Sequence, residues 1–484
     1  MKFRNRKLYK KAHFYTILYD LTRLFPLLVV PVLQNLLYKP TTTAAFITNF
    51  SISALCVVFL FAYIILEYRS TMYLEKEKSV YTKKGFFFKK RADIPYNCIQ
   101  SVYVERAFMY RIFRARKVII NTPGSYTAKG DYNLFLSKKN DLALKTEIFG
   151  KEDVDLKYNG GFLRIILMAA TWSNALTGLL IIAPVLYKTS DIVVDIFKNY
   201  FVNRLDISSY IIKIGVPPAV SGLATLLIIC WGIAYVYQLS SNAFFSTKIK
   251  NNIIHISRGL LNRYEFVTTT EKLNAIQIKQ SVLMLLLNLK SAYIQTIGSG
   301  AQKGDRSLLI PADREENINK ILSKITTLPT EENYKVKPKK TEFMSYLWFP
   351  FYCILGTVAV MLILHYLGYF AEIVRFPLFA ILGVFVYWLF FRIYSYTKSS
   401  ITICDKAVQI DYFDKLNITR TYIPYDKIQY VQIRQSPFQV FYKTAHLRIY
   451  VYSNKRKFYK IKYLKYKKVL EAVDIIETKM KYRY

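Results

Sequence analysis

The chain has 484 residues, of which 53% are hydrophobic, and its mean hydropathy is +0.16. This composition excludes an ordinary soluble protein, and the net charge of +37 indicates a strongly basic face. The five cysteines form no C-x-x-C pair, which is typical of a reduced compartment without a disulfide framework. Together these properties predict a membrane protein.

Six apolar runs approach the roughly 20 residues that are needed to cross a bilayer. They form three hairpins, of which the first and third have short connections, KPTTT and FAEIV. A buried helix of a soluble core is the alternative for any single run, but it does not suit six runs in pairs. The runs cover 14–38, 44–67, 162–187, 211–239, 343–370 and 374–395.

The basic segment MKFRNRKLYKKAH precedes the first run and predicts an uncleaved signal anchor, because a second span follows almost at once. The connections inside the hairpins are nearly neutral, whereas the segments between hairpins and the C-terminal tail are basic. The excess of Lys and Arg on cytoplasmic loops then predicts a multi-pass protein of the bacterial cytoplasmic (inner) membrane with both termini in the cytoplasm.

One sequence pattern occurs after each hairpin, as IPYNCIQSVYVERA at 94–107, TTTEKLNAIQIKQS at 268–281 and IPYDKIQYVQIRQS at 423–436. The copies align without gaps, and their apolar residues alternate at period 2, which predicts half-buried strands. Upstream, Gly85 and Gly259 share a column with Asp414, which suits a turn between strands. The predicted core columns are Ile99, Val102, Val104; Leu273, Ile276, Ile278; and Ile428, Val431, Ile433.

Each polar stretch contains several short strands and ends in a helix, such as KKVLEAVDIIETKM with one apolar face. Such a stretch predicts a small antiparallel β-barrel or sandwich that is capped by its C-terminal helix. The predicted fold class is therefore a mixed membrane protein of six transmembrane helices with three such domains. The predicted segments are 1–67 (basic N-terminus and hairpin 1), 68–160 (domain 1), 161–240 (hairpin 2), 241–330 (domain 2), 331–395 (linker and hairpin 3) and 396–484 (domain 3).

The repeated pattern I-P-x-x-K-I-Q-x-V-x-[IV]-x-Q-S, followed by strands and a helix after a membrane hairpin, resembles the bacterial pleckstrin-homology-like (PH-like) domain. Three such units in one chain resemble the YdbT-type membrane proteins of bacteria. The resemblance implies cytoplasmic PH-like domains and a shorter, single-unit membrane partner of the YdbS type. The middle copy departs most, since Thr268 and Thr269 replace Ile-Pro.

Clusters of basic residues in domains 1 and 3 are candidates for contact with lipid or a partner, since the cytoplasmic leaflet is anionic. Ordinary solvated faces with a positive-inside bias are the alternative. No nucleic-acid-binding signature appears, so nucleic acid is not an expected partner. The candidates are Lys83, Lys84, Lys89, Lys90, Arg91, Arg111, Arg114, Arg116, Lys117, Lys455, Arg456 and Lys457.

Catalytic and metal-binding patterns are missing: the four histidines have no ligand spacing, and GSGAQKGD lacks the end of a phosphate loop. We therefore expect no enzyme activity, no metal and no cofactor. The expected function is a set of binding or assembly modules at the anionic leaflet, in envelope maintenance or stress defence. The alternative is transport of a lipid or peptide through the six-helix bundle, for which Asn174 and His365 are the intramembrane polar candidates.

Overall fold

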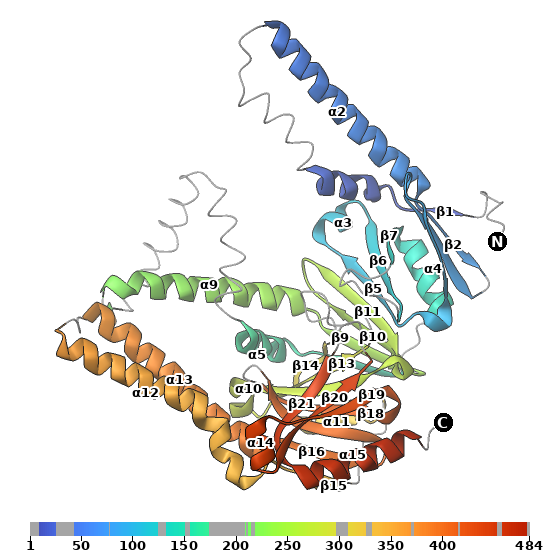
Figure 1. The fold of residues 1–484 in the computed structure, drawn as a ribbon. Helices are drawn as coiled ribbons and strands as arrows, with labels where there is room; N and C mark the ends of the chain where they lie inside the picture. Colours follow the sequence, from blue (N-terminus) through green and yellow to red (C-terminus); the bar gives the residue numbers. More distant parts are fainter. Residues whose placement is uncertain are drawn as a thin grey trace.

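In the part of the chain that it describes, the computed structural model contains four antiparallel sheets, of four, seven, seven and three strands, and apolar helices that project from them (Figure 1). The residues that it describes are 9–25, 43–76, 78–123, 132–150, 155–173, 209, 212–213, 218–296, 308–325, 332–368, 372–414, 417–452 and 457–481.

Three units of the same design follow one another along the chain: unit 1 at 9–150, unit 2 at 155–325 and unit 3 at 332–481. Among these described residues, each unit has four strands in one sheet, three strands in another, a five-residue helix after the first of these three, and a closing helix. Unit 1 comprises β1 (Lys10–Lys11), α2 (Thr43–Ser70), β2 (Met72–Lys76), β3 (Ser79–Lys84), β4 (Lys90–Pro95), η2 (Tyr96–Cys98), β5 (Ser101–Arg106), α3 (Phe108–Ile112), β6 (Ala115–Asn121), β7 (Tyr132–Ser137) and α4 (Lys138–Phe149).

Units 2 and 3 repeat this order. Unit 2 comprises β8 (Leu156–Asn159), α5 (Phe162–Trp172), α9 (Pro218–Asn242), β9 (Ser246–Lys250), β10 (Ile253–Arg258), β11 (Arg263–Thr269), η4 (Thr270–Lys272), β12 (Ala275–Ser281), α10 (Val282–Leu286), β13 (Lys290–Gln295), β14 (Leu308–Asp313) and α11 (Glu315–Leu322). Unit 3 comprises β15 (Glu332–Val336), η5 (Lys340–Glu342), α12 (Phe343–Tyr366), α13 (Glu372–Lys398), β16 (Ser400–Cys404), β17 (Ala407–Asp414), β18 (Asn417–Pro424), η6 (Tyr425–Lys427), β19 (Ile428–Arg434), α14 (Pro437–Phe441), β20 (Thr444–Val451), β21 (Lys457–Lys465) and α15 (Tyr466–Lys481).

The first strand of each unit precedes the membrane hairpin instead of following it. β1 pairs with β2, β8 with β9, and β15 with β16, so each hairpin is inserted between two neighbouring strands of one sheet. β8 falls at the end of the segment predicted as domain 1, and β15 falls in the predicted linker. Both ends of each hairpin are therefore attached to the same sheet.

Neighbouring units share a sheet. β5 of unit 1 pairs with β11 of unit 2, with Val102 opposite Val267. β12 of unit 2 pairs with β18 of unit 3, with Ile276 opposite Tyr422. In the alignment of the repeats Val102 corresponds to Ile276 and Val267 to Tyr422, so the two seams have the same register. The three-stranded part of one unit thus continues into the four-stranded part of the next.

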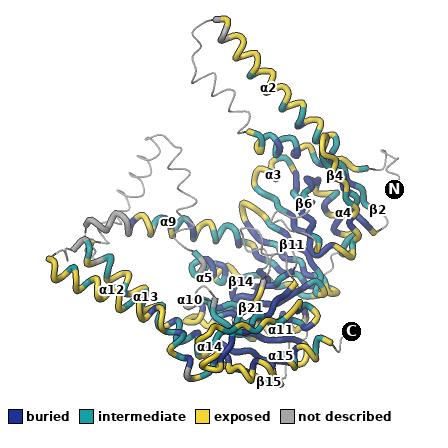
Figure 2. Tube along the Cα trace, in the orientation of Figure 1, coloured by how far each residue is buried: buried dark blue, intermediate teal, exposed yellow. Residues whose placement is uncertain are grey.

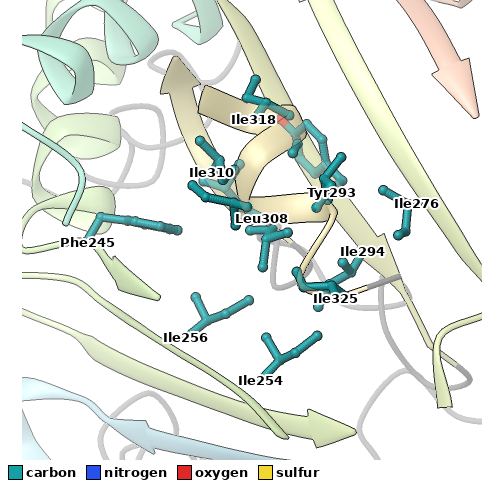
Figure 3. Packing of buried hydrophobic residues seen from close by; sticks show 14 of the residues in the cluster. Phe245, Ile254, Ile256, Ile276, Tyr293, Ile294, Leu308, Ile310, Ile318 and Ile325 are labelled. Atoms are coloured by element: carbon teal, nitrogen blue, oxygen red, sulfur yellow. The ribbon is translucent and has the colours of Figure 1, made fainter. Parts of the chain in front are cut away.

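Each unit has its own hydrophobic core. Figure 3 shows that of unit 2, where Ile254 and Ile256 of β10 lie near Tyr293, Ile294, Leu308 and Ile310 of the following strands. Val102 and Val104 are buried in the core of unit 1, whereas Tyr103, on the opposite face of β5, belongs to the core of unit 2. The seam is therefore buried on both faces of the shared sheet.

The residues of the repeated pattern occupy equivalent places in these cores. Ile99 lies in the core of unit 1, Leu273, Ile276 and Ile278 lie in that of unit 2, and Ile428 lies in that of unit 3. Val431 and Ile433 are only partly buried. This difference has a structural cause, because among the described residues β19 has a strand on one side only.

Three helices among the described residues are long and apolar enough to cross a membrane, where the sequence predicted six spans. They are Ile47–Ser70, Phe343–Tyr366 and Pro377–Lys398. These helices are largely exposed, in contrast to the strands (Figure 2). The other predicted spans, 14–38, 162–187 and 211–239, lie partly outside the described residues, although α5 and α9 cover parts of the second hairpin.

Candidate membrane-facing surface

The five-residue helices α3, α10 and α14 occupy the same position in the three units and carry exposed apolar side chains. Phe438 and Phe441 of α14 are 78% and 81% exposed, and Leu286 of α10 is 77% exposed. In α3, Phe108 and Ile112 are also exposed. Exposed apolar groups that recur at one position indicate a contact surface rather than scattered surface residues.

The local sequence specifies the form of α14. Ser436 accepts a hydrogen bond from the backbone of Gln439, whose side chain in turn accepts one from the backbone N–H of Ser436, and Pro437 begins the helix. This capping box stabilises the start of a helix that is otherwise too short to be stable alone. The helix therefore holds Phe438 and Phe441 in a defined, exposed arrangement.

These short helices lie beside the helices that enter the hairpins. Next to α3, the ring of Phe113 lies 5.9 Å from that of Phe14 and 5.3 Å from that of Tyr15, at the start of the helix over 15–25. Next to α14, Lys339 donates a hydrogen bond of 3.0 Å to the carbonyl of Tyr442, just before α12 begins. Their apolar groups are thus placed near the expected membrane boundary, where aromatic residues are favoured.

The basic cluster RIFRARK is split by the fold. Arg111 and Arg114 are exposed, and Arg111 donates a hydrogen bond of 3.2 Å to the carbonyl of Leu260. Arg116 is buried and pairs with Asp141 of α4 at 2.5 Å, so its prediction as a lipid contact is wrong. The cause is strand geometry: Arg116 lies in β6, where successive side chains point to opposite faces.

Lys117, the other β6 residue of this cluster, is largely covered. Its Nζ lies 3.7 Å from Glu105 and 5.1 Å from the centre of the Tyr19 ring. In this cluster, the exposed basic residues are therefore those in α3 and directly after it.

The other basic cluster of unit 1 lies around a cavity of about 550 Å³ at the base of the first hairpin. Lys83, Lys84 and Lys90 line this cavity together with Arg23, and two acidic residues, Asp20 and Glu67, also line it. Phe86 and Phe88 of the β3–β4 turn complete its wall. Lys89 and Arg91 are exposed beside it.

The predicted cluster of unit 3 cannot be placed, because Lys455 and Arg456 lie outside the described residues. Lys457 begins β21, but its side chain is outside them as well. Of the polar residues considered for transport, Asn174 is not described, and His365 lies in the last turn of α12. No group of three metal-ligating side chains occurs in the part of the chain that the structure describes.

A second basic group in unit 3 was not recognised from the sequence. Arg434, Arg448 and Lys460 lie on three adjacent strands. Arg448 is directly opposite Lys460 on one side and Gln432 on the other. Arg434 is two residues after Gln432 on the same face of β19 and is opposite His446. Burial lowers the pKa of His446 to about 3, and the positive charges of Lys460, Lys462 and Arg448 contribute to this lowering. The alternation of basic residues with buried ones in β20 and β21 is the signal that would have located this face.

The geometry of the repeated units agrees with the comparisons with known proteins. A family model described as the bacterial PH domain matches residues 25–159, 207–326 and 352–480. A search of curated proteins found no match. The three matches together cover most of the chain. Each covers the six later strands of one unit and reaches its closing helix, but omits the first strand of that unit; the first match also extends over β8. The chain therefore belongs to the bacterial PH domain family.

Proposed function

We propose that this chain is a non-enzymatic integral membrane protein whose three PH-like units act as binding and assembly modules at the anionic cytoplasmic leaflet. The proposal includes all six predicted spans and cytoplasmic termini. Its support is the positive-inside distribution of Lys and Arg and the insertion of each hairpin between two strands of one sheet. An attachment at both ends holds each unit close to the membrane.

The observation that carries this proposal is the recurrence of exposed apolar side chains on α3, α10 and α14. A helix of five residues does not span a bilayer, but its apolar side chains can enter the interface between headgroups and acyl chains. Arg111 of α3, Arg114 directly after it, and the lysines around the cavity at hairpin 1 supply the matching attraction to anionic headgroups.

Lipid contact is tested by fluorescence quenching in nanodiscs. The full chain, with the exposed Cys56 and Cys98 replaced by serine, receives one cysteine by Phe438→Cys, which is then labelled with bimane. Nitroxide-labelled lipids should quench this probe strongly, because α14 is expected to enter the interface. Leu470→Cys on α15 is the control, since Leu470 is also an exposed apolar residue but does not lie on a short helix. Equal quenching at the two positions would contradict the proposal.

The electrostatic part is tested separately with Met109→Cys in α3. Quenching at this position should be stronger in anionic than in neutral nanodiscs, and Arg111→Gln with Arg114→Gln should remove the difference. A probe response that is independent of lipid charge would restrict the contact to apolar insertion.

In this role the units would bind and assemble other membrane proteins, including a single-unit partner of the YdbS type. The corresponding physiological process would be envelope maintenance or stress defence. The transport alternative has less support. In Figure 1, α2 lies apart from α9, α12 and α13, so the described helices do not surround a common path.

A further inference from the structure

The series of shared sheets has an open end at unit 3. β5 has β6 on one side and β11 on the other, and β12 has β13 and β18. β19 is the equivalent strand of unit 3, yet within the described residues it pairs with β20 alone. Its second edge therefore retains the backbone groups that form the seam in the other two units.

The face of the sheet beside this edge is open as well. Ser101 and Ala275 are 0% and 1% exposed because the next unit covers them, whereas the equivalent Tyr430 is 47% exposed. In the second seam, Gln277 donates a hydrogen bond of 3.1 Å to Tyr412, and Tyr459 donates one of 2.5 Å to Gln295. Within the described part of the chain, no other segment covers the surface of unit 3 that corresponds to the one by which units 1 and 2 bind their neighbour.

This open face is basic. Arg434, Arg448 and Lys460 lie across it, and no carboxylate pairs with them among the described residues. Burial lowers the pKa of Lys460 to about 8, and Lys462, Arg448 and Arg434 add to this lowering. Nε of Arg448 is buried without a hydrogen-bond partner in the described part of the chain. An occupant with negative charge would relieve these unfavourable positive charges.

A second copy of the chain does not match this charge. At the other open end of the series, β4 pairs only with β3 within the described residues. If β4 of a second copy paired with β19 in the register of the two seams, its Lys90 would lie opposite Arg434 and its Arg91 opposite Ile433. Like charges directly opposite each other destabilise a strand pair.

We infer that β19 accepts a strand from a different polypeptide, in the register of β11 and β18, with a carboxylate opposite Arg434. The incoming strand adds to the three-stranded sheet by backbone hydrogen bonds, as in other cases of strand addition. In this register, every second side chain of the incoming strand lies on the same face as Tyr430, Gln432 and Arg434 and opposite one of them. This strand-binding surface is distinct from the proposed lipid contact, because it corresponds to the surfaces by which units 1 and 2 bind the next unit.

Disulfide trapping in nanodiscs tests the inference. The full chain carries Cys56→Ser, Cys98→Ser and Tyr430→Cys. The probes are peptides of residues 262–270 from β11, in which Thr268→Cys places the thiol opposite position 430. Tyr264, the residue opposite Arg434 in this register, is left unchanged or replaced by Glu or Lys. A peptide of residues 88–96 from β4 with Ile94→Cys represents a second copy of the chain.

The Tyr264→Glu peptide should be trapped about fivefold or more faster than the Tyr264→Lys peptide, since attraction replaces repulsion at one cross-strand pair. The same peptide with Val267→Cys instead of Thr268→Cys should react poorly, because a shift of one residue moves the thiol to the opposite face. The internal control is Ser101→Cys with Thr268→Cys in one chain, which joins the equivalent pair of the first seam.

Four results would overturn the inference. Equal trapping through positions 267 and 268 would show that no register exists. Trapping of the β4 peptide as fast as the Tyr264→Glu peptide would make a second copy the occupant. If no peptide is trapped while the internal control forms its disulfide, β19 is not an acceptor. Protection of the thiol introduced at position 430 by anionic but not neutral nanodiscs would assign the face to lipid instead.

Discussion

Individual charged residues have two distinct environments in this protein. Glu265 of β11 lies in the first seam, where Lys145 of α4 approaches its carboxylate to 2.7 Å and Arg106 of β5 also pairs with it. Burial raises the pKa of Glu265, but Lys145 and Arg106 outweigh this effect and bring the pKa to about 2. These buried ion pairs lie within the seam, whereas Arg111 and Arg114 are exposed at the surface.

Glu265→Gln should lower the free energy of unfolding by about 1–3 kcal/mol at pH 7. The loss stays below that of an isolated buried pair because Lys145 also lies 3.3 Å from Asp141. Since the folded pKa lies below the unfolded value of 4.5, the stabilisation is present above pH 4.5 and is lost as the pH falls towards 2. Denaturant unfolding in detergent at several pH values measures this.

The difference between the wild type and Glu265→Gln should therefore shrink between pH 4.5 and pH 2. Glu271→Gln provides the control, since Glu271 is exposed at the same seam and should have little effect. A constant difference over this pH range would mean that the charge of Glu265 does not stabilise the seam.

At the level of elements, the sequence predicted the strands that carry long apolar alternation and missed the short ones. β12 and β19 follow from their alternating Ile and Val residues, but β8 and β15, with LKYN and ENYKV, contain little alternation. Their pairing depends on β9 and β16, which follow the hairpins, so nothing local reveals it. The exposed helices α3, α10 and α14 were missed for a related reason: five residues are too few for helical periodicity.

The candidate site was also predictable only in part, because the exposure of each basic residue depends on tertiary structure that the local sequence does not reveal. Adjacent basic residues look equivalent in the sequence, but the change from the turn after α3 to β6 exposes Arg114 and buries Arg116. The face with Arg434, Arg448 and Lys460 is formed by three strands, and its members are separated along the chain. A search for consecutive basic residues therefore cannot find it.

The turn glycines are the clearest case in which sequence and structure agree. Gly85 and Gly259 have φ of +98° and +106°, in the turns before β4 and β11. A Cβ atom at Gly259 would lie 2.0 Å from the carbonyl oxygen of Asn262. Both turns therefore need a residue without a side chain.

Gly259→Ala should destabilise unit 2 by roughly 1–3 kcal/mol, because of the strained backbone and the clash with Asn262. Gly161→Ala is the matched control, since a Cβ there meets no atom within 4 Å and its φ is −57°. Thermal unfolding in detergent measures the difference. If Gly259→Ala and Gly161→Ala unfold at the same temperature, the turn accommodates the side chain without loss of stability.

At the scale of the whole molecule, shared sheets join the three units into one continuous series, so the units are not independent domains connected only by linkers. Six residue pairs join β12 to β18, and the side-chain hydrogen bond from Asn274 to the carbonyl of Tyr452 lies at the same seam. Strand pairing with buried faces on both sides is typical of an obligate contact. The seam between units 2 and 3 should therefore persist without the covalent connection between them.

A chain divided between residues 328 and 329 tests this expectation. When the two parts are expressed together, they should purify as one complex, because the β12–β18 pairs and the packing of both faces remain. Thr421→Pro in β18 should reduce recovery of the complex, since proline removes a ladder hydrogen bond in a central strand. Gln429→Pro is the control, because Gln429 lies at the register shift of the edge strand β19, where proline is tolerated. Separate purification of the unmodified parts would mean that the shared sheet alone does not hold the units together.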